Sequence, residues 1–110
     1  MNSWYKVKNI DEVDSPSLLI YPERVRHNIE LAIEIAGNVD RLRPHVKTHK
    51  MGEIISMQLD YGIHKFKCAT IAEAEMVAIA GGKDIMLAHQ PTPPKRVHSP
   101  ILEISTPPLK

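Results

Sequence analysis

The sequence predicts an α/β fold in which short parallel strands alternate with helices, in the order β-α-β-α-β-α-β. Three observations support this prediction. Short apolar runs alternate with segments of helical periodicity, each helical segment ends at a glycine, and the connections between elements are short. Strands that alternate with helices of about 10–15 residues pair in parallel through right-handed crossovers.

The first two elements are a strand and the most regular helix of the chain. Ser15-Pro16 introduces the apolar run SLLIY, residues 17–21, which predicts a buried strand. Pro22 suits a first helical turn because its missing N–H would have no partner there. Apolar residues then recur at helical spacing as far as Gly37, which supplies the stop signal.

Five further elements complete the pattern: a strand at 43–49, a helix at 51–62, a strand at 65–69, a helix at 70–82 and a strand at 84–89. Thr70 can cap the N3 amide of its helix while Glu73 reaches back, which is the capping-box pattern. Gly81 and Gly82 end this helix before the last strand.

The stretch RPHVKTHK, residues 43–50, raises three hypotheses: a metal site, a nucleic-acid-binding patch and a reactive lysine. On a helix, His45 and His49 would lie about 6 Å apart, close enough to share one metal ion. The alternation of elements instead places the stretch in the second strand, where steps of about 3.3 Å separate the two histidines by roughly 13 Å. Pro44 also favours extended geometry at Arg43. The sequence therefore predicts no metal site on this pair.

Lys47 is the candidate functional residue of this strand. Period-two alternation predicts His45, Lys47 and His49 on one face and Val46 and Thr48 on the other. Lysines seldom point into a closed interior without a function, and parallel α/β folds place active sites at the C-terminal ends of their strands. Partial burial beside cationic neighbours lowers the pKa of a lysine, as a Schiff-base nucleophile requires. The residues alone leave two interpretations open: a reactive Lys47, or a solvated charge on a loop.

Composition excludes several classes of partner and compartment. The formal net charge of +1 gives no reason to expect a nucleic acid or an acidic membrane as a partner. The single cysteine, Cys68, excludes an intrachain disulfide and fits a reducing compartment. No run approaches the roughly 18 apolar residues of a membrane helix, and the first residues lack the apolar core of a signal peptide. We therefore expect a soluble cytoplasmic protein.

Three segments carry a resemblance to a known family: SPSLLIYPERVRHNIELA from Ser15, RLRPHVKTHKMGEI from Arg41 and KFKCATIAEAEMVAIAGGKDIMLA from Lys65. They resemble the N-terminal part of the D-threonine aldolase and D-serine dehydratase group, among the alanine racemase-like (fold type III) enzymes that use pyridoxal 5′-phosphate (PLP). The resemblance implies the N-terminal portion of a (β/α)8 TIM-type barrel with parallel strands. A full barrel takes roughly 250 residues, so this barrel would be incomplete.

The resemblance implies a site as well as a fold. Lys47 matches the lysine that binds PLP and is the catalytic residue, and His45 and Thr48, which border it, would help to shape the cofactor pocket. The divalent metal of the full-length family would have its ligands outside this chain, so no metal ligand is expected here.

The implied function is that of a PLP-dependent lyase on D-3-hydroxy amino acids, with cleavage of the D-threonine aldolase type to glycine and an aldehyde. The alternatives are a β-elimination of the D-serine dehydratase type and a PLP-binding protein without catalysis. The expected partner is a small D-amino acid, and a homo-oligomer remains open. By itself the 110-residue chain is expected to be an incomplete and inactive form of the enzyme.

The predicted organisation has three parts. Residues 1–14 form an N-terminal leader, residues 15–91 form the partial alanine racemase-like barrel domain, and residues 92–110 form a proline-rich tail that departs from the family. Six of the nine prolines lie in the last 20 residues, which separates this tail from the ordered-looking body.

Overall fold

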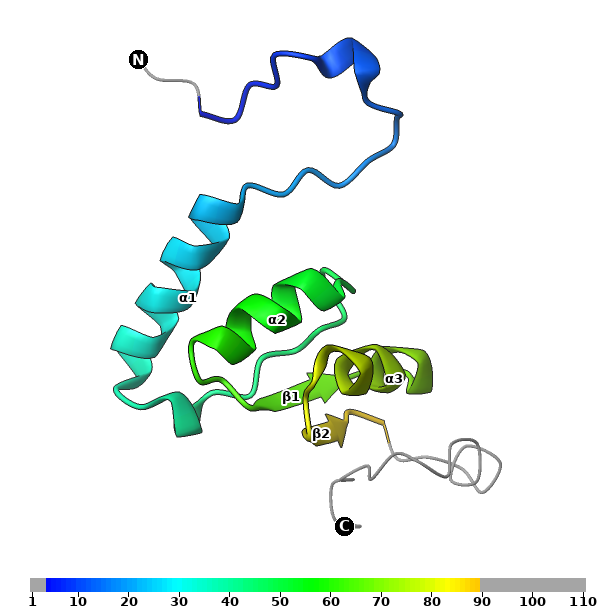
Figure 1. Ribbon diagram of the computed structural model, residues 1–110. Coiled ribbons are helices and arrows are strands. Elements are labelled where there is room, and N and C mark those ends of the chain that lie inside the picture. The colour runs from blue at the N-terminus through cyan, green and yellow to red at the C-terminus, as the bar shows by residue number, and fades with distance from the viewer. Residues whose placement is uncertain (1–3, 90–110) are drawn as a thin grey trace.

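A two-stranded parallel sheet and three α-helices form the described part of the chain, residues 4–89 of a computed structural model (Figure 1). Two short 3-10 helices, Ile10–Glu12 and Val39–Arg41, precede and follow the first α-helix. The predicted tail at residues 92–110 lies outside the described residues.

The three predicted helices are confirmed. They are α1 at Pro22–Ala36, α2 at Gly52–Asp60 and α3 at Ile71–Ala80. Gly37 and Gly81 follow α1 and α3 with φ angles of 82° and 110°, in the left-handed region that glycine adopts without steric cost. The longest of the described helices, α1, has 15 residues, and none of the helices within residues 4–89 is long and apolar enough to cross a membrane.

The start of α3 confirms the predicted capping pair, with a small shift in register. The Thr70 hydroxyl oxygen accepts a hydrogen bond from the Glu73 N–H at 3.1 Å. The Glu73 carboxylate accepts from the Ala69 N–H at 3.0 Å, one residue before the cap residue itself. The bond to Thr70 satisfies a backbone donor that the first turn of α3 would otherwise leave unpaired.

The strands confirm parallel pairing but are shorter than predicted. Strand β1, Lys65–Cys68, pairs in parallel with β2, Asp84–Leu87. The predicted second strand is reduced to one bridge, from His45 to Lys67 on the other edge of β1. The Val46 N–H donates to the Lys67 carbonyl and the Lys67 N–H donates to the Pro44 carbonyl, both at 2.9 Å. The segment 44–46 therefore acts as a third parallel row of the sheet.

The predicted strand at residues 17–21 is wrong for this structure. Ser17 to Ile20 have no regular secondary structure, and Leu18 and Leu19 are 65% and 42% exposed. A strand is held by hydrogen bonds to a neighbour. Within residues 4–89, no strand pairs with this segment, and Leu18 and Leu19 stay exposed to solvent.

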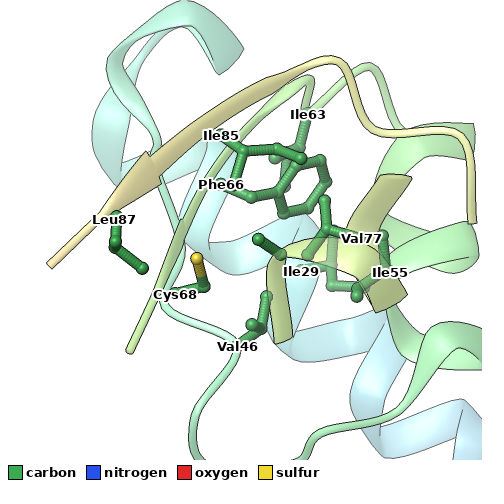
Figure 2. Packing of buried hydrophobic residues seen from close by; sticks show 10 residues of the cluster. Ile29, Val46, Ile55, Ile63, Phe66, Cys68, Val77, Ile85 and Leu87 are labelled. Atoms are coloured by element: carbon green, nitrogen blue, oxygen red, sulfur yellow. The ribbon is translucent and has the colours of Figure 1, made fainter. Parts of the chain in front are cut away.

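The hydrophobic core lies between one face of the sheet and the helices (Figure 2). Phe66 and Cys68 of β1 and Ile85 and Leu87 of β2 are buried on this face, where they meet side chains from the helices such as Val77 of α3. The alternate residues of both strands are partly exposed. The described helices thus cover one face of the sheet and leave the other open.

Candidate functional site

The candidate site lies at one edge of the sheet, the C-terminal edge, where the C-terminal ends of its parallel strands lie together. The segment 44–46, β1 and β2 run in the same direction, so the residues that follow them, Lys47, Ala69 and Ala88, lie at one edge. Open parallel sheets place their ligands beyond this edge. The structure therefore places Lys47 at the edge where the sequence predicts a site.

The chain turns immediately after Val46, and this turn sets the position of Lys47. The Lys50 N–H donates to the Val46 carbonyl at 2.9 Å, and Lys50 has a φ angle of 53°. The predicted alternation of faces therefore holds for His45 and Val46 and is wrong from Lys47 onward. Val46 is fully buried, whereas Lys47 and Thr48 lie in the turn and are exposed.

His45 orients the backbone at Lys47. Its ring Nδ1 accepts a hydrogen bond from the Lys47 N–H at 3.2 Å. In the neutral ring the proton is therefore on Nε2, which is a donor. Burial lowers the pKa of His45 below its ordinary value, the positive charge of Lys47 lowers it further, and Glu73 opposes the shift. His45 is thus a neutral hydrogen-bond donor near pH 7.

The electrostatic neighbours of His45 add three residues that sequence reasoning did not assign to the site. Besides Lys47, these neighbours are Lys67, Glu73 and His89. Glu73 stands in the first turn of α3, which begins just after β1, and His89 follows β2 by two residues. Their sequence positions, just beyond the C-terminal ends of two parallel strands, are the signal that would have found them.

The second histidine of the motif points away from this edge. His49 Nδ1 accepts from the Met51 N–H at 2.9 Å, and its Nε2 is buried without a hydrogen-bond partner. Its ring lines a cavity between α1, α2 and residues 41–44. Within residues 4–89, no group of three or more His, Cys, Asp or Glu side chains is arranged to hold a metal ion.

Arg43 fixes the motif to the sheet. Its Nη1 donates to the Phe66 carbonyl at 3.1 Å and to the Asp84 carbonyl at 3.3 Å. Its Nη2 lies 2.8 Å from the Asp84 carboxylate. Hydrogen bonds to charged groups are the stronger ones. Arg43 thereby holds the segment that carries His45 and Lys47 in register with both strands.

Cys68 is a packing residue and not a nucleophile. The side chain is fully buried, and its Sγ contacts the Met86 carbonyl at 3.7 Å. Burial, together with the charge of Glu73, raises the pKa of the Cys68 thiol to about 11. The thiolate is the reactive form of cysteine, so this side chain stays an inert thiol near pH 7.

Comparisons with known proteins agree with the resemblance. The family model of the alanine racemase N-terminal domain matches residues 20–104. The chain is 33% identical over 86 residues to the D-threonine aldolase of Arthrobacter sp. This match covers 77% of this chain and 23% of that protein. It is 34% identical over 77 residues to the D-threo-3-hydroxyaspartate dehydratase of Delftia sp. (strain HT23). This second match covers 69% of this chain and 20% of that protein. No solved structure matches the chain significantly.

The extent of these matches decides what they show. The chain spans less than a quarter of the length of the curated relatives it matches. The family match extends to residue 104, beyond the boundary predicted at residue 91 between the barrel domain and the tail. That boundary stays a prediction. Because the match covers well over half of the chain, and the parallel strands fit part of a TIM-type barrel, the chain belongs to the alanine racemase N-terminal domain family.

Proposed function

We propose that this chain is part of a PLP-dependent lyase that acts on D-3-hydroxy amino acids, with the Lys47 amine as the group that binds the cofactor aldehyde. The observation that carries the proposal is the position of Lys47. It is exposed in a turn that directly follows the bridged segment, at the C-terminal edge of the parallel sheet. An amine at this edge is open to a small aldehyde.

The residues around Lys47 fit the chemistry of the cofactor. PLP carries an aldehyde for an amine and a phosphate for cationic or hydrogen-bonding groups. Lys67 and His89 are electrostatic neighbours of His45 and supply groups that attract a phosphate. We assign His45 and Thr48 as cofactor-binding residues. His45 offers its Nε2–H, and Thr48 offers an exposed hydroxyl one residue after Lys47.

The division of labour follows from these positions. When bound, PLP supplies an electron sink for the bond that breaks at Cα of an amino acid. Lys47 holds the cofactor, and Arg43, through its bonds to Phe66 and Asp84, holds the strand segment that leads to Lys47. His45 fixes the Lys47 backbone through Nδ1 and keeps its Nε2 proton for an oxygen of the cofactor or substrate.

The names of the relatives support the substrate class. Both D-threonine and D-threo-3-hydroxyaspartate carry a hydroxyl on the carbon next to Cα. We put cleavage of the D-threonine aldolase type first, since the longer match is to that enzyme. A β-elimination of the dehydratase type is the second candidate, which the match to the hydroxyaspartate dehydratase favours. A cofactor-binding role without turnover is the third.

A PLP titration followed by absorbance tests the assignment of Lys47. We expect saturable binding with a new absorbance band for the natural chain, and loss of that band in Lys47→Ala. Lys83→Ala is the matched control, because Lys83 is also exposed but lies just before β2, at the opposite edge of the sheet. Equal bands for Lys47→Ala and the natural chain would contradict the proposal.

A further inference from the structure

A hollow of about 240 Å³ lies between the end of the turn that carries Lys47 and the N-terminal half of α3, and it has no role in the proposed function. Lys47 itself does not line it. Drug-sized ligands occupy cavities of about 300–1,000 Å³, so a hollow of this size suits a smaller molecule. Among residues 4–89, its wall is formed by Lys50, Thr70, Ala72, Glu73 and Met76.

The hollow has a cation and an anion in its wall, and the two do not pair. Lys50 comes from the end of the turn, and Glu73 comes from the first turn of α3. Neither side chain takes part in an ion pair with any residue between 4 and 89. The Lys50 ammonium therefore lies too far from the Glu73 carboxylate to neutralise it directly, and a small molecule can lie between the two groups.

Glu73 is a buried acid without a cationic partner in the described part of the chain. It is only 6% exposed. Its carboxylate accepts hydrogen bonds from the Ala69 N–H at 3.0 Å and from the Thr70 hydroxyl at 3.3 Å. Both donors are neutral, and each carboxylate oxygen can accept a second hydrogen bond. Because buried charges in proteins are generally paired, Glu73 indicates an occupant of the hollow that carries a cationic group.

The backbone fixes Lys50 beside the hollow. The Lys50 N–H donates to the Val46 carbonyl at 2.9 Å, and the φ angle of Lys50 is 53°, in the left-handed region that glycine adopts without steric cost. The turn therefore holds the Lys50 side chain, an ammonium with three hydrogen-bond donors, at the wall of the hollow. This ammonium suits an anionic group of the occupant, as Glu73 suits a cationic one.

We infer that this hollow binds a free α-amino acid with a small side chain, whose ammonium pairs with Glu73 and whose carboxylate pairs with Lys50. An α-amino acid carries both charges on one carbon near pH 7, so a single small molecule meets both groups of the wall. Ala72 and Met76, four residues apart on α3, add apolar surface for a short side chain. Because both charged groups of the ligand are held, the amino acid is bound in this hollow and is not converted there.

A glycine titration followed by NMR, without PLP, tests this inference independently of the proposed function. We expect saturable shifts of the amide signals of Lys50, Ala72 and Glu73. Glycinamide lacks the carboxylate and N-acetylglycine lacks the ammonium, so each should bind at least about tenfold more weakly than glycine through the loss of one charge-assisted hydrogen bond. The absence of saturable shifts with glycine overturns the inference, as does equal binding of glycine and either analogue.

Two variants each remove one charge from the wall. Lys50→Gly removes the ammonium and suits the positive φ angle, so the turn is kept. Glu73→Gln removes the negative charge and keeps an oxygen that can accept from Ala69. Each should weaken glycine binding at least about tenfold. The matched controls Lys83→Ala and Glu53→Gln change exposed charges that do not line the hollow and should leave binding unchanged. Equal glycine affinity of Lys50→Gly and the natural chain would contradict the inference.

Discussion

The guanidinium of Arg43 lies 2.8 Å from the carboxylate of Asp84, although a whole strand separates the two residues in the sheet. Arg43 precedes the bridged segment 44–46, Asp84 begins β2, and β1 lies between them. The same side chain donates to the carbonyls of Phe66 and Asp84. One arginine therefore ties together the three parallel rows of the sheet.

Removal of this side chain should loosen the sheet. We expect Arg43→Ala to lower the free energy of unfolding by about 1–2 kcal/mol, since two carbonyl bonds and a partly exposed ion pair are lost. Asp84→Asn should cost less than about 1 kcal/mol because both carbonyl bonds remain. Urea unfolding measures both values. Arg26→Ala, on the exposed face of α1, is the control, and an equal effect of the two arginine variants would contradict this role for Arg43.

Stability should fall as the pH drops below about 6.5, in part because of His49. Burial lowers the pKa of His49 from its ordinary value of 6.5, while Glu73 opposes the shift. Below 6.5 the unfolded chain takes up a proton that the folded chain refuses, so the contribution is fully present above 6.5 and is lost at lower pH. Protonation would also break the bond that His49 Nδ1 accepts from Met51.

His49→Asn tests this dependence, because the asparagine oxygen can replace Nδ1 as an acceptor but does not titrate. Urea unfolding at about pH 8 and about pH 5.5 should show a smaller difference for this variant than for the natural chain. The remaining difference includes His45, whose pKa is also lowered, chiefly by burial. His27→Asn, on the exposed surface of α1, is the control. Identical pH profiles for His49→Asn and the natural chain would exclude the proposed effect.

Gly82 is required by close packing rather than by its backbone angles. A Cβ at this position would lie 2.5 Å from Val77 Cγ1 and 3.2 Å from Phe66 Cδ2, both in the core. We expect Gly82→Ala to destabilise the fold by about 1–3 kcal/mol through overpacking. At Gly52 the nearest atom is Ala80 Cβ at 4.0 Å, so Gly52→Ala should be neutral or stabilising by up to about 1 kcal/mol. Thermal unfolding compares the two variants, and equal melting temperatures would disprove the packing argument.

The helices could be predicted from the sequence because their signals are local. Pro22 and Gly37 bound α1, and Thr70 and Gly81 bound α3, at positions where each residue type has its own physical reason. A strand depends instead on a neighbour that can lie far away in sequence. Residues 65–68 and 84–87 have such neighbours, whereas residues 17–21 have none among the described residues 4–89. An apolar run therefore gave a correct prediction at residues 84–87 and a wrong one at residues 17–21, while the strand at 65–68 was predicted correctly from its alternating pattern.

The position of Lys47 relative to the sheet could be predicted, but the local geometry around it could not. Parallel pairing alone places Lys47 at the C-terminal edge of the sheet. The turn at residues 47–49 contains no glycine that would have predicted it, and Lys50, a non-glycine residue, adopts a positive φ angle after it. The rings of His45 and His49 each accept a hydrogen bond from the backbone amide two residues later, and such bonds compete with an extended strand. As a result, His45 lies beside Lys47, whereas His49 lines the cavity between α1 and α2.

Borohydride reduction is the measurement that tests the central claim most directly. The purified chain is incubated with PLP at low concentration, reduced with borohydride and digested. The modified lysine is then located by peptide sequencing. We predict that the label is on Lys47 and that Lys47→Ala loses it. Label spread over other lysines, such as Lys8, Lys65 and Lys83, would show that Lys47 is not the cofactor-binding residue of this chain.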